Sequence, residues 1–229
     1  MSIFDGKIYK KPIEKHFELL SSIFLYTCIV IALIISIFNV IFMSATVKGL
    51  SMWPNVNKDV SINGRDEISK NTDVVYYSSI FPVDYGDVII VDLPRKEDDG
   101  IKRFIAKGGD VIGFNDIDSE DYYLYLNGSK LIEPYLNDIS KNRTTIKNFL
   151  NVNNTSNSFV QEVFDKPYQY EIIVPEGSFL YLGDNRSVSA DCSIYGPQPL
   201  SKLIGKVIIH LPYGYNVLTY YWSKLWGLV

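Results

Sequence analysis

The sequence predicts a mainly β protein, with a single N-terminal transmembrane helix followed by an antiparallel β domain outside the cytoplasm. Two patterns support this fold class. Residues 19–47 contain no charged side chain, whereas the rest of the chain alternates short runs of β-branched and aromatic residues with turn residues. The strongest local signal is Asn127-Gly128 between two apolar runs, because both residues tolerate the positive φ angles of a two-residue hairpin turn.

The uncharged segment predicts a membrane anchor. About 20 apolar residues cross the hydrocarbon core as a helix, and this run exceeds the roughly 7–15 residues of the apolar region in a cleavable signal peptide. More lysines precede the segment than follow it, namely Lys7, Lys10, Lys11 and Lys15 before it and Lys48 and Lys58 after it. We therefore expect a cytoplasmic segment over 1–18, a transmembrane helix over 19–43 and an extracytoplasmic β domain over 44–229. The alternative is a buried helix of a soluble protein, and the length of the run counts against it.

Short runs rich in β-branched and aromatic residues predict the strands of the domain. The clearest runs are 74–77, 88–91, 172–174, 179–182 and 207–209, and Gly, Pro and Asp residues typical of turns separate them. No segment outside the anchor has a long helical period, so we expect mainly antiparallel pairing between these strands.

Two segments depart from the strand pattern. Residues 137–158 are rich in Asn, Ser and Thr, and we expect a mobile surface excursion that buries too little to order itself. Residues 213–229 are rich in Tyr and Trp and carry Lys224 as their only charged side chain. Such a segment suits the boundary between water and lipid, but a strand or helix that covers the core fits the composition equally well.

The composition argues against several classes of function. A net charge of −4 provides no basic excess to neutralise phosphates, so we expect no nucleic-acid partner. Cys28 lies inside the apolar run and Cys192 lies far outside it, so no disulfide framework is expected. With two histidines in the chain we expect no histidine-rich metal site and no cofactor. The oligomeric state is not predicted.

Ser51 is the candidate nucleophile, because it closely follows the anchor in a stretch of small and rigid residues. A serine hydroxyl needs a base to attack a carbonyl group. His16 precedes the anchor, and His210 alternates with apolar residues in a predicted strand, which is more typical of a structural histidine. Lys102 is flanked by apolar strand residues, and an amine can act as a base when burial disfavours its charged form. Taken alone, a lysine in a strand more often faces solvent.

Four motifs, in this order along the chain, resemble those of the bacterial type I signal peptidases. They are Gly49-Leu50-Ser51-Met52-Trp53-Pro54, Ile101-Lys102-Arg103, Gly109-Asp110, and Gly183-Asp184-Asn185-Arg186 followed by Ser189 and Asp191. The N-terminal anchor also lies where that family places it. The resemblance runs from the anchor to about Leu211 and excludes the Asn-rich segment.

This resemblance implies a Ser/Lys dyad. Ser51 would attack the scissile carbonyl group, Lys102 would act first as general base and then as acid, and Ser189 would orient the lysine amine. The same motifs imply a second set of residues around the dyad: Arg103, Asp184 and Asp191 in a supporting polar network, Ser51 and Gly49 at the oxyanion, and Val47, Met52 and Ile101 in shallow pockets for small side chains.

Several positions depart from the family pattern. Asn55 stands where the family has threonine, and Cys192-Ser193 stands where it commonly has Ser-Arg, so a local Asp–Arg pair is missing. Gly49 occupies a position where some members carry a hydroxyl that donates to the oxyanion, and the loss of one such donor costs about 2.7–4 kcal/mol in the barrier. We expect these departures to affect rate and substrate range more than the existence of activity.

The resemblance implies a membrane-anchored serine endopeptidase that cleaves signal peptides from exported preproteins after small residues, at Ala-x-Ala-like sites. Its expected partners are those preproteins and the lipid bilayer. The alternative is a catalytically weak or silent relative that binds exported surface subunits and assists their assembly.

Overall fold

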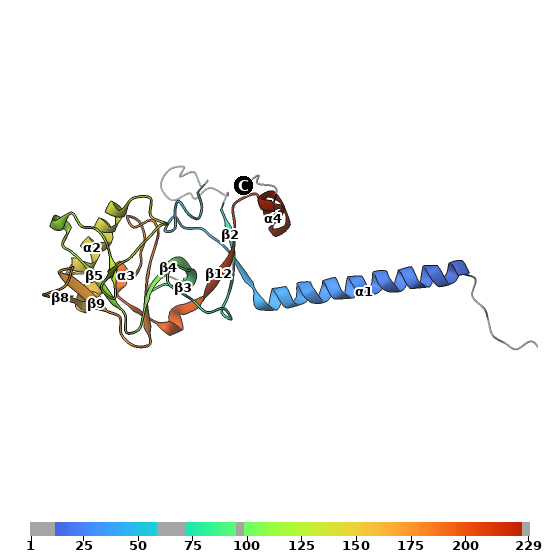
Figure 1. The fold of residues 1–229 in the computed structure, drawn as a ribbon, viewed down its shortest axis with the longest axis horizontal. Helices are drawn as coiled ribbons and strands as arrows, with labels where there is room; N and C mark the ends of the chain where they lie inside the picture. Colours follow the sequence, from blue (N-terminus) through green and yellow to red (C-terminus); the bar gives the residue numbers. More distant parts are fainter. Residues whose placement is uncertain (1–11, 59–71, 95–98, 226–229) are drawn as a thin grey trace, which may run out of the picture. The chain divides into compact units, whose positions relative to one another are not determined.

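The computed structural model describes residues 12–58, 72–94 and 99–225 (Figure 1). The chain forms two compact units, Met1–Phe42 and Met43–Val229. Three of the lysines that predict the cytoplasmic side, Lys7, Lys10 and Lys11, lie outside the described residues.

The first unit contains one long apolar helix, α1 Pro12–Ile41. Proline is favoured at the first helical position, because its fixed φ suits a helix and an N–H there would have no partner. The stretch His16–Ile41 has 26 residues, and its most apolar 18-residue window has a mean hydropathy of 2.6. At about 1.5 Å per residue this length exceeds the ~30 Å hydrocarbon core of a bilayer. The helix begins before the predicted residue 19 and ends before the predicted residue 43, because Met43 already pairs in a strand.

A seven-stranded sheet forms the larger layer of the second unit. Its strands lie in the order β1-β2-β12-β3-β4-β10-β11, and each neighbouring pair is antiparallel. The strands are β1 Met43–Thr46, β2 Val74–Ser78, β3 Val88–Asp92, β4 Asp99–Lys107, β10 Ser178–Leu182, β11 Gln198–Pro199 and β12 Leu203–Leu211. Four of the five predicted runs lie in this sheet, which confirms the mainly antiparallel β fold.

A five-stranded antiparallel sheet forms the other layer, in the order β7-β6-β5-β9-β8. Its strands are β5 Val111–Phe114, β6 Tyr125–Leu126, β7 Ser129–Lys130, β8 Val160–Glu162 and β9 Tyr170–Ile173. Asn127 and Gly128 join β6 to β7 with φ angles of 51° and 84°. The predicted hairpin is therefore confirmed, with both turn residues in the left-handed region.

Short helical segments connect the strands. They are α2 Asn142–Leu150, α3 Cys192–Tyr195 and α4 Val217–Leu225, together with the 3-10 turns η1 Ile117–Ser119, η2 Ile139–Lys141, η3 Thr155–Phe159 and η4 Leu200–Lys202. The main hydrophobic core draws buried side chains from both sheets and from α2. A smaller cluster under the start of the domain contains Val47, Met52, Val56, Val75, Tyr77, Ile90 and Ile101.

Helix α2 corrects the expectation of a mobile excursion over 137–158. Ile146 and Phe149 are fully buried, and the ring centroids of Phe149 and Phe114 lie 5.1 Å apart. The asparagines that suggested disorder instead satisfy the end of the helix: the Asn154 amide donates to the Asn148 carbonyl at 3.1 Å. The composition argument was wrong here because two well-spaced apolar residues suffice to dock a nine-residue helix on an existing core.

The C-terminal segment leaves β12 at Leu211 and forms helix α4. Of its nine residues only Ser223 is buried, so the helix covers little of the core. The composition leaves open a segment at the boundary between water and lipid or an element that covers the core. The described part of the segment is a helix whose surface is largely exposed.

Candidate active site

Ser51 lies in a tight turn that follows β1. The backbone N–H of Trp53 donates to the Leu50 carbonyl at 3.1 Å, and that of Val56 donates to the Met52 carbonyl at 3.0 Å. The Trp53–Pro54 peptide bond is cis. These local bonds fold the stretch 50–56 back on itself and leave Ser51 half-buried at its start.

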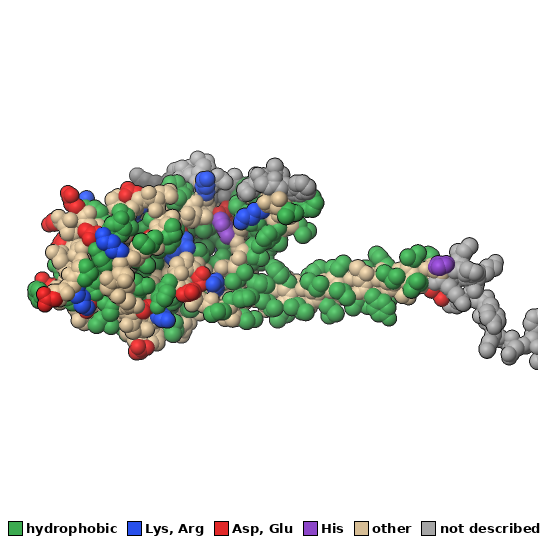
Figure 2. Space-filling view, in the orientation of Figure 1, with side chains coloured by type: hydrophobic (Ala, Val, Ile, Leu, Met, Phe, Trp, Pro, Cys, Tyr) green, Lys and Arg blue, Asp and Glu red, His purple; other side chains and the backbone are tan. Residues whose placement is uncertain are grey.

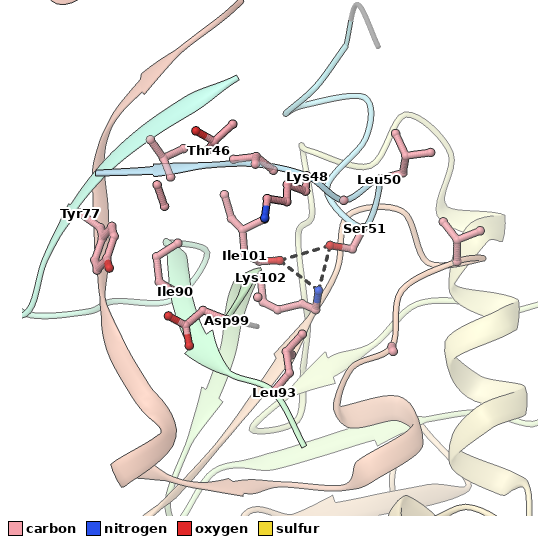
Figure 3. A pocket seen from close by; sticks show the side chains of 17 residues that line it. Thr46, Lys48, Leu50, Ser51, Tyr77, Ile90, Leu93, Asp99, Ile101 and Lys102 are labelled. Carbon is pink, nitrogen blue, oxygen red and sulfur yellow. Dashed lines mark hydrogen bonds between the residues drawn. The ribbon is translucent and has the colours of Figure 1, made fainter. Parts of the chain in front are cut away.

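Lys102 lies in the middle of β4 and reaches Ser51. The lysine residue is 3% exposed. Its Nζ lies 2.8 Å from Ser51 Oγ and donates to the Ile101 carbonyl oxygen at 3.1 Å, while Ser51 Oγ lies 3.3 Å from the same carbonyl (Figure 3). Side chains alternate between the two faces of a strand, and both faces of β4 are buried. Lys102 is therefore enclosed by the protein, although a lysine side chain carries a charge in water. The structure thus brings the two predicted catalytic residues into direct contact.

Asn57 holds the base of the Ser51 loop. Its side-chain amide donates to the carbonyl oxygens of Val47 at 2.7 Å and Gly49 at 3.0 Å. Its backbone N–H donates to Asp73 Oδ2 at 2.6 Å, and its Oδ1 accepts from the Asp73 N–H at 2.8 Å. Asn57 has a φ angle of 60°, in the left-handed region where asparagine is enriched. A single buried amide therefore ties both ends of the loop together.

Asn185 holds the loop from the opposite side. Its backbone N–H donates to the Ser51 carbonyl at 2.9 Å, and its side-chain amide donates to the Leu50 carbonyl at 3.2 Å. Within the described part of the chain no group accepts a hydrogen bond from the Ser51 backbone N–H. This N–H is therefore available to a ligand placed beside the hydroxyl.

Asp184 connects the Ser51 loop to β4. The Arg103 guanidinium donates to its two carboxylate oxygens, from Nε to Oδ1 at 2.8 Å and from Nη2 to Oδ2 at 2.5 Å. Asn55, the residue that replaces the family's threonine, donates from its amide to Asp184 Oδ2 at 2.8 Å. The Arg103 guanidinium also lies over the Tyr135 ring, 4.0 Å from its centroid. The predicted supporting residues Arg103 and Asp184 thus form one buried network.

Gly183 permits the close approach of three segments. A Cβ added there would lie 2.5 Å from the Ser51 carbonyl oxygen and 2.3 Å from Ser189 Oγ, so only glycine fits. Asp191 accepts from the Gly183 N–H at 2.9 Å and from the Ser193 N–H at 3.0 Å. Two backbone donors therefore bind the Asp191 carboxylate in this chain, where the family's arginine is missing. Ser189 Oγ is buried and has no hydrogen-bond partner among the described residues.

A cavity of about 500 Å³ lies beside Ser51 and Lys102. Figure 3 shows Ser51 and Tyr77 on opposite sides of it. Of the three predicted pocket residues, Val47 and Ile101 line the cavity, whereas Met52 does not. Met52 is fully buried and packs in the apolar cluster behind the cavity wall, because its flexible side chain fills the space under the turn. Gly49 lines the cavity with its backbone.

His210 has a structural partner. Its Nε2 lies 2.7 Å from Asp73 Oδ2, and Asp73 also accepts from the backbone N–H of Tyr213 at 3.0 Å. Burial raises the pKa of the Asp73 carboxyl, but hydrogen bonds from His210 and from the Asn57 and Tyr213 N–H groups outweigh it and hold the pKa below its ordinary value. This arrangement matches the structural histidine favoured by the sequence, and Lys102 is the candidate base that contacts Ser51.

A second buried polar cluster was not predicted. The Arg186 guanidinium donates to the carboxylate of Glu133, to the side-chain oxygen of Asn142 and, at 3.0 Å, to the Gly183 carbonyl. Arg186 belongs to a recognised motif, but Glu133 and Asn142 lie in segments without one. A buried arginine needs a carboxylate partner to balance its charge, so a carboxylate is expected somewhere nearby in the fold. The sequence does not identify which carboxylate it is.

Comparison with known proteins identifies relatives of this chain. A sequence model of the family described as signal peptidase, peptidase S26, matches residues 18–211. The signal peptidase IB of Staphylococcus aureus (strain COL) is 30% identical over 171 residues, which are 71% of this chain and 73% of that protein. The signal peptidase I of Bacillus caldolyticus is 32% identical over 187 residues, 80% of this chain and 85% of that protein. A crystal structure of a signal peptidase I from Enterococcus faecalis V583 is 26% identical and covers 57% of this chain and 100% of that one, with a TM-score of 0.38.

The family match covers most of the chain, and both relatives align over more than two thirds of it. Two of the motifs that carry the resemblance meet at the Ser51–Lys102 contact, and a third holds Ser51 through the Asn185 backbone. This chain therefore belongs to the bacterial type I signal peptidases, peptidase family S26, and is a serine endopeptidase of that family.

Proposed function

We propose that this enzyme is anchored in the membrane by α1 and cleaves signal peptides from exported preproteins after small residues, using Ser51 as nucleophile and Lys102 as general base. The observation that supports the proposal most strongly is the 2.8 Å separation of Lys102 Nζ from Ser51 Oγ in a buried environment. An amine in this position accepts the hydroxyl proton once it is uncharged, and burial disfavours the charged form of an amine.

The proposed reaction has two steps. Ser51 Oγ attacks the scissile carbonyl carbon as its proton moves to Lys102 Nζ; the peptide C–N bond then breaks while Lys102 returns that proton to the leaving amine. The product of this step is an ester between Ser51 and the signal peptide. A water molecule attacks the ester and gives a proton to Lys102, which releases the signal peptide with a new carboxylate and returns the proton to Ser51 Oγ.

The Ser51 backbone N–H is the proposed donor to the oxyanion, because no described residue accepts its hydrogen bond. Gly49, the second predicted oxyanion position, has no side chain to donate. A Cβ added at Gly49 would meet no atom within 4 Å, so a Gly49→Ser side chain has space. We expect Gly49→Ser to keep or raise kcat; a large fall in kcat would show that the glycine backbone itself is required there.

Ser189 is the proposed hydroxyl that orients the Lys102 amine. Its buried Oγ has no partner among the described residues, so it can donate without breaking another hydrogen bond. We expect Ser189→Ala to lower kcat while the unfolding temperature stays near that of the wild type. Rescue of kcat by Ser189→Thr, which keeps the hydroxyl, separates this positioning role from a packing role.

The cavity supports cleavage after small side chains. Val47 and Ile101 form apolar walls close to Ser51, and Met52 fills the space behind them. A large side chain on the substrate would have to displace this packed cluster, which costs energy in the transition state. Anchoring both the enzyme and the signal peptide in one bilayer would raise their effective concentration and fix the depth of the cut. In this arrangement the N-terminus lies in the cytoplasm and the β domain lies outside.

The alternative, a silent relative that assists subunit assembly, is not favoured, because the dyad geometry is intact. A direct test uses full-length protein in vesicles with a preprotein that carries an Ala-x-Ala site. Wild type is expected to release the mature protein, and neither Ser51→Ala nor Lys102→Ala is expected to do so. Cleavage by either variant would refute its assigned role, and failure of the wild type on several preproteins would favour the assembly role.

A further inference from the structure

Helix α4 Val217–Leu225 presents an apolar and aromatic surface outward. Leu218, Tyr221, Trp222 and Leu225 are 83%, 52%, 65% and 77% exposed. We call these four residues the α4 face. Their spacing of three and four residues places them on one side of a helix, where a soluble helix normally carries polar side chains. Figure 2 shows apolar side chains gathered on this part of the domain surface.

The opposite side of α4 carries its polar and packing contacts. Asn216 and Thr219 cap its start reciprocally: the Thr219 N–H donates to Asn216 Oδ1 at 2.9 Å, and the Asn216 N–H donates to Thr219 Oγ1 at 3.0 Å. The Tyr220 ring packs edge-on against Tyr215, with centroids 5.9 Å apart. Ser223, the one residue of α4 that is buried, lies on this same side of the helix, opposite the α4 face.

The strand register places the segment that leads into α4 two strands away from β1, the first strand of the domain. Leu211, the last residue of β12, pairs with Val74, and Val74 pairs with Thr46 of β1. Thr46 is three residues after Met43, where the domain begins, and α1 ends at Ile41. If α1 spans the bilayer as proposed, this corner of the domain is tethered within a few residues of the bilayer surface. The far end of the domain, with β8 and β9, lies away from this corner (Figure 1).

The chemistry of the α4 segment fits a lipid surface. Residues 212–225 contain no acidic side chain, and Lys224 is their only charged one. Tyr and Trp favour the headgroup level of a bilayer, because their rings are apolar while their polar atoms can still reach water. The family match ends at residue 211, so α4 is an addition to the part of the chain that the family description covers.

We infer that the α4 face lies in the headgroup region of the same bilayer that α1 spans, as a second membrane contact that fixes the orientation of the catalytic domain. The inference rests on the proposed anchorage and deepens it. A second contact restricts the rotation of the domain about its tether, so that the Ser51 site meets the cleavage site of a membrane-held preprotein at a defined depth.

The test uses tryptophan fluorescence of the full-length protein in vesicles of phosphatidylcholine and phosphatidylglycerol. The chain has three tryptophans, so Trp53→Phe with Trp226→Phe leaves Trp222 as the single emitter. Lipids brominated near the headgroup end of the acyl chain are expected to quench most of the Trp222 emission. The matched control replaces all three tryptophans by Phe and adds Phe164→Trp, at a position that is 80% exposed beyond β8. Its emission is expected to be unchanged by bromination.

Equal Trp222 emission in brominated and ordinary vesicles would overturn the inference. Emission that changes with the number of protein molecules per vesicle, but not with bromination, would also overturn it, because the α4 face would then bind a second copy of the chain. A functional arm uses Leu218→Ser with Leu225→Ser, for which we expect on the order of a tenfold loss of kcat/KM on a vesicle-held preprotein and no loss on a short soluble peptide. Equal losses on both substrates would contradict the positioning role. Cleavage by the wild type is measured separately, so quenching without cleavage refutes only the proposed function, and cleavage without quenching refutes only this inference.

Discussion

Two buried cations in the β domain have partners of different kinds. Arg186 faces the Glu133 carboxylate, and although burial opposes its charge, that carboxylate outweighs burial and raises the arginine pKa. Lys102 instead places its amine against the Ser51 hydroxyl and the Ile101 carbonyl. The first arrangement favours a permanent charge that holds segments together. The second contacts a group that can exchange a proton, which is what a general base needs.

The comparison predicts its largest effect at Lys102. Lys102→Met keeps the length and apolar stem of the side chain but removes the base, so kcat/KM is expected to fall on the order of 10⁴-fold or more. The unfolding temperature in detergent is expected to stay the same or to rise, because a buried amine is replaced by an apolar group. If this variant loses activity only in proportion to its loss of folded protein, Lys102 has a structural role like that of Arg186 and is not the base.

Arg186 is expected to show the reverse behaviour. Arg186→Met leaves the Glu133 carboxylate buried without its partner, which costs about 3–5 kcal/mol of stability. Adding Glu133→Leu removes the unpaired charge and is expected to recover much of that loss. The midpoints of urea unfolding for the two variants measure the difference. If the double variant is no more stable than the single one, the loss comes from packing and not from an uncompensated charge.

Gly183→Ala is expected to have the next largest effect. It acts where the Ser51 loop and Ser189 approach each other. Its Cβ would press on the Ser51 carbonyl and on Ser189 Oγ. A displacement of the nucleophile by about 1 Å costs on the order of 10²-fold in kcat. Kinetics on a soluble peptide measure this effect. Gly128→Ala is the control: it adds a Cβ to a glycine with φ of 84° and open space in the distant hairpin, and it should leave kcat unchanged.

The smallest expected effect concerns Asp73 and pH. Its pKa in the folded protein lies below the ordinary value of 3.8, so the folded state binds a proton less readily than the unfolded chain. The stability from this carboxylate is therefore present above the unfolded pKa and is lost as pH falls through the folded pKa. Wild type should exceed Asp73→Asn in stability at neutral pH, and the gap should close on acidification. A gap that is independent of pH would contradict this sign.

The sequence is sufficient to predict the parts of the site that lie inside recognisable motifs. Ser51 and Lys102 are found in this way, and the antiparallel strands follow from short runs between turn residues. Asn57 is not predictable, because its role depends on a left-handed backbone angle and on Asp73, 16 residues further along the chain. Helix α2 is missed for a related reason: asparagines that follow it donate to the carbonyl groups at its end, and composition alone does not distinguish such capping from disorder.

Met52 shows a limit of the family resemblance as well. Its position next to the nucleophile suggests a pocket residue, but the turn over 50–56 directs its side chain into the cluster behind the cavity. Adjacency in sequence does not determine which side of a turn a side chain faces. The hydrogen bonds from Trp53 and Val56 that close this turn are visible only in the structure.

The pH dependence of kcat/KM tests the central claim most directly, because it reports the protonation state of the base. The full-length enzyme in vesicles is assayed on a soluble Ala-x-Ala peptide from mildly acidic to alkaline pH. We predict a tenfold rise per pH unit that levels off below the ordinary lysine pKa of about 10.4, and the loss of this rise in Lys102→Met. A flat profile in the wild type, or the same rise in residual activity of Lys102→Met, would contradict the assignment of Lys102 as the base.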